Sequence, residues 1–215
     1  MKLRLGVLIS GRGSNLQALI DAARDQDFPA EVALVISNKA DAPGLERARA
    51  AGIPAIVLKP RDYADKPSHE AAMTEALDAA GVGLVCLAGY MRLLSPWFVA
   101  RWHDRLINIH PSLLPAFPGL DTHARAIATG VRFHGCTVHF VRVEMDEGPI
   151  LVQAAVPVAD DDTPDTLAAR VLVQEHRAYP LAVRLIAEGR VGVQGNRVAV
   201  RGAGLASAMI GPAIP

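Results

Sequence analysis

The stretch Leu3-Arg4-Leu5-Gly6-Val7-Leu8-Ile9, followed by Ser10-Gly11-Arg12-Gly13-Ser14-Asn15, decides the fold of this chain. Its seven mostly apolar residues predict a buried strand, and the glycine-rich segment after them predicts a tight turn. The turn leads into an Ala- and Leu-rich helical pattern that reaches Arg24. A strand, a glycine turn and a helix in this order form the first part of a βαβ unit.

The same alternation continues along the first half of the chain. Short apolar runs predict further strands, and helical patterns lie between the earlier ones. Continuous apolar strands are typical of a parallel sheet that helices cover on both faces, so we expect a doubly wound, mostly parallel α/β fold. The predicted strands are Leu3–Ile9, Glu31–Ser37, Ile53–Leu58, Gly83–Ala88 and Arg105–His110, and the predicted helices are Ser14–Arg24, Pro43–Ala51, Pro67–Ala80 and Pro96–Trp102.

The pattern changes in the second half. Cys136–Glu144 and Ile150–Val158 predict two long strands, joined by a turn at Met145–Pro149, that extend the sheet in antiparallel fashion. Thr163-Pro164-Asp165 is a good helix start and opens the longest predicted helix, which ends at Glu188. A small hairpin is expected around Gly195-Asn196. We expect a single domain over residues 1–202 and a mobile tail over 203–215.

Composition excludes several classes of function. The chain has 22 basic and 22 acidic residues, so no net charge favours nucleic acid or an anionic membrane. Its two cysteines, Cys86 and Cys136, stand alone in apolar segments, without the spacing of a zinc site. No apolar run is long enough to cross a bilayer, and the N-terminus does not resemble a signal peptide. We expect a cytoplasmic protein without a metal.

The glycine turn after the first strand is suited to an anion. Its glycines let the backbone approach a ligand closely, and the N-terminus of the next helix offers unpaired N–H groups. A dinucleotide fingerprint would need Gly at Leu16, and a P-loop would need Gly-Lys-Ser/Thr, so both are excluded. The turn predicts a phosphate site, although a purely structural glycine turn remains the alternative.

A second candidate site lies at Asn108-Ile109-His110-Pro111. Side chains two positions apart leave a strand on the same face, so Asn108 and His110 point together. Pro111 ends the strand there, and ligands bind at the carboxyl ends of strands in open α/β sheets. An amide donor beside an imidazole can stabilise a carbonyl oxygen that becomes negative during acyl transfer. The alternative for His110 is an ordinary interior histidine.

Two further segments allow two interpretations each. Asp146 is either a turn-forming residue or a carboxylate that lies beside His110 and favours its charged form. The run Met91-Arg92-Leu93-Leu94 is either an apolar wall for a flat ring system or an ordinary helix-packing segment. The remaining histidines are scattered and are expected to be solvent or core residues.

Taken together, the motifs resemble the phosphoribosylglycinamide formyltransferases, a family of folate-dependent enzymes of purine biosynthesis. The resemblance covers about residues 3–190 in register, which makes it far more specific than any single motif. It rests on Ser10–Asn15, Ser37–Ala42, Leu87–Arg92, Asn108–Pro115, Pro118-Gly119, Asp146–Ile150 and Gln174-Glu175-His176.

The resemblance implies a role for particular residues. In the half of the chain before about residue 105 it implies a phosphate site, and in the half over 106–202 it implies folate binding and catalysis. The implied catalytic residues are Asn108, His110 and Asp146. The residues implied to bind the ribonucleotide are Gly13, Ser14 and Asn15 at its phosphate and Glu175 at its glycinamide end. The residues implied to bind folate are Met91, Arg92, Leu93, Leu94 and Asn108, together with Lys66, which stands where the family often has Arg.

The activity implied is transfer of the formyl group of 10-formyltetrahydrofolate, as co-substrate, to the amine of 5'-phosphoribosylglycinamide. Two alternatives use the same chemistry, namely formyltetrahydrofolate hydrolase and a formyltransferase that acts on another amine. We expect those relatives to carry further domains that this chain does not show. A phosphate-sensing module is a different class, which has no need for Asn108 and His110 together. The expected partners are small molecules, and the sequence leaves monomer and homodimer open.

Overall fold

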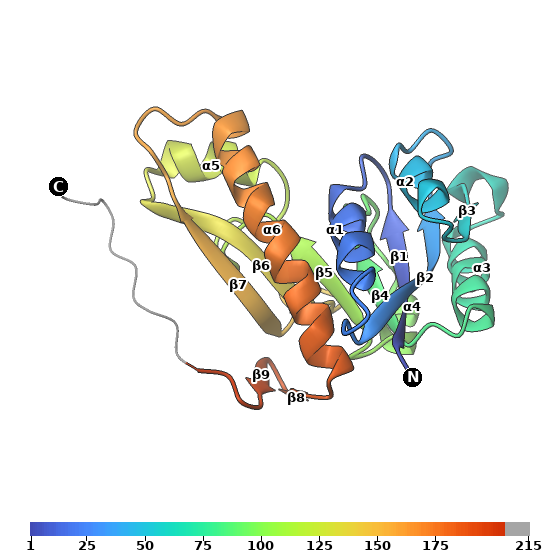
Figure 1. Cartoon of the computed structure of the whole chain (residues 1–215). Coiled ribbons are helices and arrows are strands. Elements are labelled where there is room, and N and C mark those ends of the chain that lie inside the picture. Colours follow the sequence, from blue (N-terminus) through green and yellow to red (C-terminus); the bar gives the residue numbers. More distant parts are fainter. Residues whose placement is uncertain (205–215) are drawn as a thin grey trace.

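The computed structural model describes residues 1–204 of the chain. A seven-stranded sheet lies at its centre (Figure 1), formed by β1 (Leu3–Ile9), β2 (Ala30–Ser37), β3 (Ala55–Val57), β4 (Leu84–Leu87), β5 (Leu106–His110), β6 (Phe133–Phe140) and β7 (Ile150–Pro157). The strand order is β3-β2-β1-β4-β5-β6-β7. The first five strands are parallel, whereas β6 is antiparallel to β5 and β7 is antiparallel to β6. Strands from before and after residue 105 belong to this one sheet, so both halves of the chain share it.

Helices cover both faces of this sheet (Figure 1), as a doubly wound fold requires. They are α1 (Ser14–Ala23), α2 (Gly44–Ala50), α3 (Lys66–Ala79), α4 (Pro96–Arg101), α5 (Thr122–Thr129) and α6 (Pro164–Ala187), with a short 3₁₀ helix at Pro60–Asp62. One core cluster joins the sheet to α1, α2, α5 and α6. A second cluster on the opposite face joins it to α3 and α4.

Alternation along the strands distributes side chains between these two clusters. In β1, Leu5, Val7 and Ile9 pack in the α1 and α6 cluster, and Leu8 packs in the α3 and α4 cluster. All four are fully buried. Strands that are apolar on both faces therefore reflect a sheet with helices on both sides, which confirms the predicted fold class.

Most predicted elements form, and the differences have local causes. The strand predicted at Cys136–Glu144 instead begins at Phe133 and ends at Phe140, because its partner β5 begins at Leu106, whose carbonyl accepts from the Val141 N–H at the end of the ladder. Helix α5 was absent from the predictions. It is short, and its N-cap residue Asp121 makes no side-chain cap.

The C-terminal part of the described chain contains the predicted hairpin. Strands β8 (Val191–Gln194) and β9 (Arg197–Val200) pair antiparallel and form a separate two-stranded sheet. Most of the tail predicted over 203–215, namely residues 205–215, lies outside the described residues. Within residues 1–204, no helix combines the length and apolar character needed to span a membrane.

Candidate active site

The end of β5 places Asn108 and His110 on the same face of the sheet. Ile107 and Ile109 pack in the α1 and α6 cluster, so the alternating residues Asn108 and His110 face the other side. The strand ends at His110, as the following proline predicted. His110 is 6% exposed, and Asn108 is partly buried. The structure therefore supports the predicted geometry of this pair.

Both ring nitrogens of His110 face acceptors. Its Nε2 lies 3.0 Å from the carbonyl oxygen of Phe117, and its Nδ1 lies 3.5 Å from the Oδ2 atom of Asp146. A carbonyl oxygen can only accept, so Nε2 carries a hydrogen. A protonated ring would then have an N–H directed at each oxygen. Phe117 itself has a φ of 54°, an uncommon conformation for a non-glycine residue, and it holds its carbonyl toward the imidazole.

Asp146 reaches this pair from the loop between β6 and β7. Its side chain is 10% exposed, and its Oδ2 accepts a hydrogen bond of 2.8 Å from the Gly119 N–H. The backbone of Asp146 is left-handed, with a φ of 61°, which aspartate tolerates better than most residues. Of the two interpretations of Asp146, the structure therefore favours the carboxylate beside His110.

The structure adds a residue to this cluster that the sequence did not single out. His139 on β6 pairs directly with Asn108 in the antiparallel register. Its Nε2 lies 3.3 Å from Nδ2 of Asn108 and 3.9 Å from Oδ1 of Asp146. Burial lowers the pKa of His139, although a hydrogen bond to Phe140 and the charge of Asp146 oppose this shift. Only the pairing register of β5 and β6 places His139 beside Asn108, and this register cannot be read from the sequence.

The turn between β1 and α1 has the geometry expected of an anion site. Gly13, immediately before α1, has a φ of 68°, and a Cβ atom there would lie 2.7 Å from Cα of Gly44. Only glycine fits this position without strain, because the backbone is left-handed and α2 is close. No side chain caps α1, so its first N–H groups remain available to a ligand.

Asn15 and Glu175 lie together although 160 positions separate them in sequence. Nδ2 of Asn15 donates to Oε2 of Glu175 at 2.6 Å, and both side chains are buried. Burial raises the pKa of Glu175, and the bond from Asn15 partly offsets this effect. The structure thus brings the start of α1 and the middle of α6 into one site, as the predicted ribonucleotide residues require.

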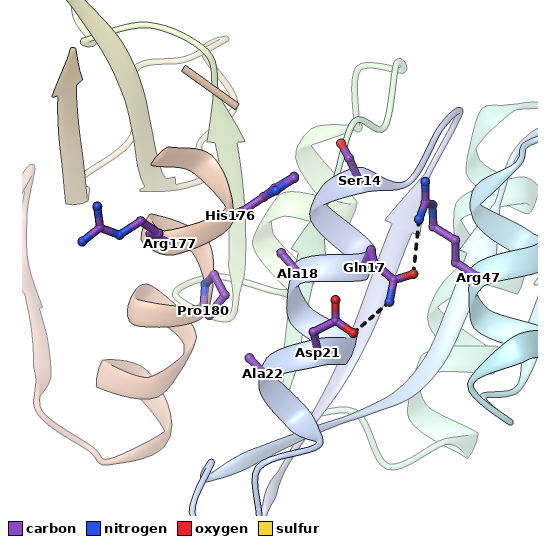
Figure 2. A pocket seen from close by; sticks show the side chains of 9 residues that line it. All are labelled: Ser14, Gln17, Ala18, Asp21, Ala22, Arg47, His176, Arg177 and Pro180. Atoms are coloured by element: carbon purple, nitrogen blue, oxygen red, sulfur yellow. Dashed lines mark hydrogen bonds between the residues drawn. The ribbon is translucent and has the colours of Figure 1, made fainter. Parts of the chain in front are cut away.

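A groove of about 640 Å³ runs beside this pair, between α1 and α6. Figure 2 shows Ser14 at the start of α1 and His176 on α6, whose ring points toward α1. Arg47 of α2 lies at its edge, where its guanidinium donates to Gln17 and to the carbonyl of Arg12. Burial and the charge of Arg47 lower the pKa of His176. His176 is part of the Gln174-Glu175-His176 motif, but no role for it was predicted from the sequence.

The run Met91–Leu94 forms a loop between β4 and α4. Met91 and Leu93 are 67% and 68% exposed, so the helix-packing interpretation does not hold for these two side chains, whereas Leu94 packs against the α3 and α4 cluster. Ser10 fixes the start of this loop beside the glycine turn, because its Oγ accepts from the Met91 N–H at 2.9 Å. Lys66 is placed differently. It begins α3, and its ammonium lies 3.9 Å from the carboxylate of Glu70.

Strand register relates these clusters to one another. Leu8 of β1 pairs with Leu87 of β4, and Leu87 pairs with Asn108 of β5. Neighbouring strands lie about 4.8 Å apart, so Asn108 and Leu8 are separated by about 10 Å across the sheet. The glycine turn, the Met91 loop and His110 all follow at the carboxyl ends of these strands. They share the edge at which open α/β sheets bind ligands.

Comparison with known proteins agrees with this arrangement. A family model described as formyl transferase matches residues 3–183. The chain is 47% identical over 194 residues to the phosphoribosylglycinamide formyltransferase of Escherichia coli, covering 90% of this chain and 92% of that protein. It is 52% identical over 188 residues to the trifunctional purine biosynthetic protein adenosine-3 of Drosophila melanogaster, where it covers 86% of this chain but 14% of the longer protein.

Solved structures show the same likeness. The glycinamide ribonucleotide transformylase 1 of Symbiobacterium toebii superposes with a TM-score of 0.90 at 53% identity, over 93% of this chain and 94% of that one. The family model covers most of the chain, and the E. coli relative matches it over nearly its whole length. The chain therefore belongs to the formyl transferase family.

Proposed function

We propose that this protein transfers the formyl group of 10-formyltetrahydrofolate to the amine of 5'-phosphoribosylglycinamide. The observation that carries the proposal is the convergence of Asn108, His110 and Asp146 at the end of β5, on the sheet edge that also carries the glycine turn. The names of the relatives, which include phosphoribosylglycinamide formyltransferase, support the same substrates.

In this proposal the ribonucleotide binds at the start of α1. The N–H groups of Gly13, Ser14 and Asn15 hold its phosphate, where the helix N-terminus favours negative charge. Glu175 contacts the glycinamide end, because Asn15 holds its carboxyl group at this site. The phosphate is thereby anchored at a distance from the reacting amine, which positions that amine for attack.

Folate binds at the end of β5, between the loop that follows β4 on one side and the loop that joins β6 to β7 on the other. The loop Met91–Leu94, with its exposed Met91 and Leu93, offers apolar side chains for the ring system and backbone groups for its edge. The loop that carries Asp146 lies on the opposite side of β5 from the Met91 loop and adds exposed Met145. Lys66 is the least supported of the proposed folate residues, because its charge pairs with Glu70.

The chemistry is a direct transfer. The unprotonated amine attacks the formyl carbon, a new C–N bond forms, and the carbonyl oxygen becomes an oxyanion. The bond between that carbon and N10 then breaks, and tetrahydrofolate leaves with a proton on N10. That proton comes from the attacking amine and passes through water. Neither a covalent enzyme intermediate nor a metal takes part in this scheme.

Two of the three proposed catalytic side chains act on the oxyanion directly, and the third acts through the imidazole. Asn108 donates an amide N–H to it, and the protonated ring of His110 stabilises the same charge. Asp146, 3.5 Å from the ring, orients the imidazolium and balances its charge. Donors held in place before the reaction lower the barrier, because they need no reorganisation when charge appears.

The experiment that tests the proposal mixes the purified protein with 5'-phosphoribosylglycinamide and 10-formyltetrahydrofolate and follows release of tetrahydrofolate. The proposal predicts release that depends on the ribonucleotide, together with one formylated nucleotide for each tetrahydrofolate. Equal release without the nucleotide would identify a hydrolase instead. No release with this nucleotide, but release with methionyl-tRNA or an amino sugar, would identify a different acceptor.

A further inference from the structure

His139 occupies an unusual place for a buried histidine. It lies on β6 directly opposite Asn108, it is 2% exposed, and both residues point to the face that carries His110. The charged groups that face it are His110 on β5 and Asp146 in the loop after β6. Its Nε2 atom is 3.3 Å from Nδ2 of Asn108. The ring is therefore a direct neighbour of the amide that is proposed to donate a hydrogen bond to the formyl oxygen.

The hydrogen bonds of the ring fix its tautomer. Nδ1 of His139 lies 3.1 Å from the carbonyl oxygen of Phe140, and that oxygen can only accept. Nδ1 therefore carries the hydrogen, and in the neutral ring Nε2 has a free lone pair. Because burial lowers the pKa of His139, the neutral ring is the form favoured inside the protein. Nε2 then accepts an N–H from Asn108.

This bond decides which way the Asn108 amide faces. An amide can rotate by 180° and exchange its oxygen and nitrogen. With Nδ2 toward His139, one N–H is held by the ring and the second remains for the formyl oxygen. In the rotated form Oδ1 would face the lone pair of Nε2, and the developing oxyanion would meet an acceptor instead of a donor. Both interactions are repulsive.

We propose that His139 is a positioning residue, which accepts one N–H of Asn108 and so holds the other toward the formyl oxygen. This inference rests on the proposed function for its substrate. The inference goes beyond the proposed function because it assigns control of turnover to a residue that does not contact the reacting atoms. Its action passes through Asn108, so removing Asn108 must remove the effect of His139.

A double-mutant cycle tests this dependence. His139→Leu removes the acceptor and fills the buried space with an apolar side chain. His139→Gln restores an acceptor near the Nε2 position. In the otherwise native protein, His139→Leu is expected to lower kcat by about 10- to 100-fold, with KM changed by less than about threefold. His139→Gln is expected to recover most of this loss.

The same substitution is then made in the Asn108→Ala protein. There His139→Leu is expected to change kcat by less than about twofold, because no amide remains to be positioned. An equal loss of kcat in both backgrounds would overturn the proposal, since it would show that His139 acts independently of Asn108. Full activity of His139→Leu in the native background would overturn it as well.

A measurement without turnover completes the test. Long-range ¹⁵N–¹H NMR of the imidazole nitrogens is expected to show Nδ1 protonated and Nε2 unprotonated at neutral pH, with the Nε2 signal shifted by Asn108→Ala. A protonated Nε2, or a signal that ignores Asn108→Ala, would overturn the proposal even if His139→Leu fails to fold. Absence of formyl transfer by the unmodified protein would instead refute the proposed function, so the two failures are distinguishable.

Discussion

Burial sets the charge of single residues at the site, and Glu175 gives the clearest consequence. Its folded-state pKa is raised, so the folded protein holds the proton more tightly than the unfolded chain does. Stability from this group is present below the ordinary glutamate pKa, and it is lost as pH rises through the raised value. Replacement by glutamine removes this loss and keeps an acceptor for Asn15.

We therefore predict that Glu175→Gln is more stable to urea than the native protein at neutral pH. The difference should shrink as pH falls and disappear below about pH 4.5, where the native carboxyl group is also neutral. Urea unfolding at several pH values measures it. Parallel stability curves for the two proteins would show that Glu175 does not titrate as proposed.

Single residues also differ in how well their position in the site could be predicted from the sequence. Asn108 and His110 could be predicted as a pair, because strand alternation and the proline after His110 are local properties. The contact of Asp146 with His110 could not, because it depends on a loop whose path includes a left-handed residue. His139 was missed for a similar reason, since only the register of β5 and β6 places it beside Asn108.

At the level of elements, the position of α1 depends on Gly13. Gly13→Ala is expected to cost about 1–3 kcal/mol. The alanine would have to keep a φ of 68°, and its Cβ would lie 2.7 Å from the backbone of Gly44. The shift of the helix start should also raise KM for the ribonucleotide more than KM for the folate. Urea unfolding and steady-state kinetics measure these two effects.

Gly11 supplies a matched control in the same turn. A Cβ at Gly11 would meet no atom within 4 Å, so Gly11→Ala should change stability by less than about 0.5 kcal/mol. If both alanine variants have the same stability, the close approach of α1 and α2 is not what requires glycine at position 13.

The longest helix, α6, depends on its first turn. The hydroxyl of Thr163 accepts from the Thr166 N–H, and the Thr166 hydroxyl accepts from the Thr163 N–H in return. Thr163→Ala removes one of these bonds and is expected to destabilise the protein by about 1 kcal/mol. Thr129→Ala, near the end of α5, is the matched control and should cost clearly less. A loss of the same size in both variants would contradict a capping role.

Elements were predictable where their signals were strong. Thr163-Pro164 marks the start of α6, and turn residues mark the ends of the early strands. Helix α5 was missed because it is only eight residues long and Asp121, before its first residue, makes no capping bond. The end of β6 was misplaced by four residues because Val141–Glu144 keep a strand-like composition although the strand ends at Phe140.

For the whole molecule, parallel topology determines where a site can form. Strands β1, β4 and β5 are neighbours in the sheet although about 100 residues separate the first from the last. Their carboxyl ends bring the glycine turn, the Met91 loop and His110 to one edge. The alternating strand and helix pattern predicted this fold class, but the sequence alone could not show which strands are neighbours.

The central claim is that Asn108 stabilises the formyl oxygen only when negative charge develops on it. The most direct test is kcat of Asn108→Ala, measured together with the dissociation constants of both substrates and compared with Asn196→Ala, which alters an exposed turn between β8 and β9. We predict that kcat falls by about 100- to 1000-fold for Asn108→Ala while both dissociation constants change by less than about threefold. A kcat close to that of the native protein, or a loss confined to substrate binding, would contradict the account.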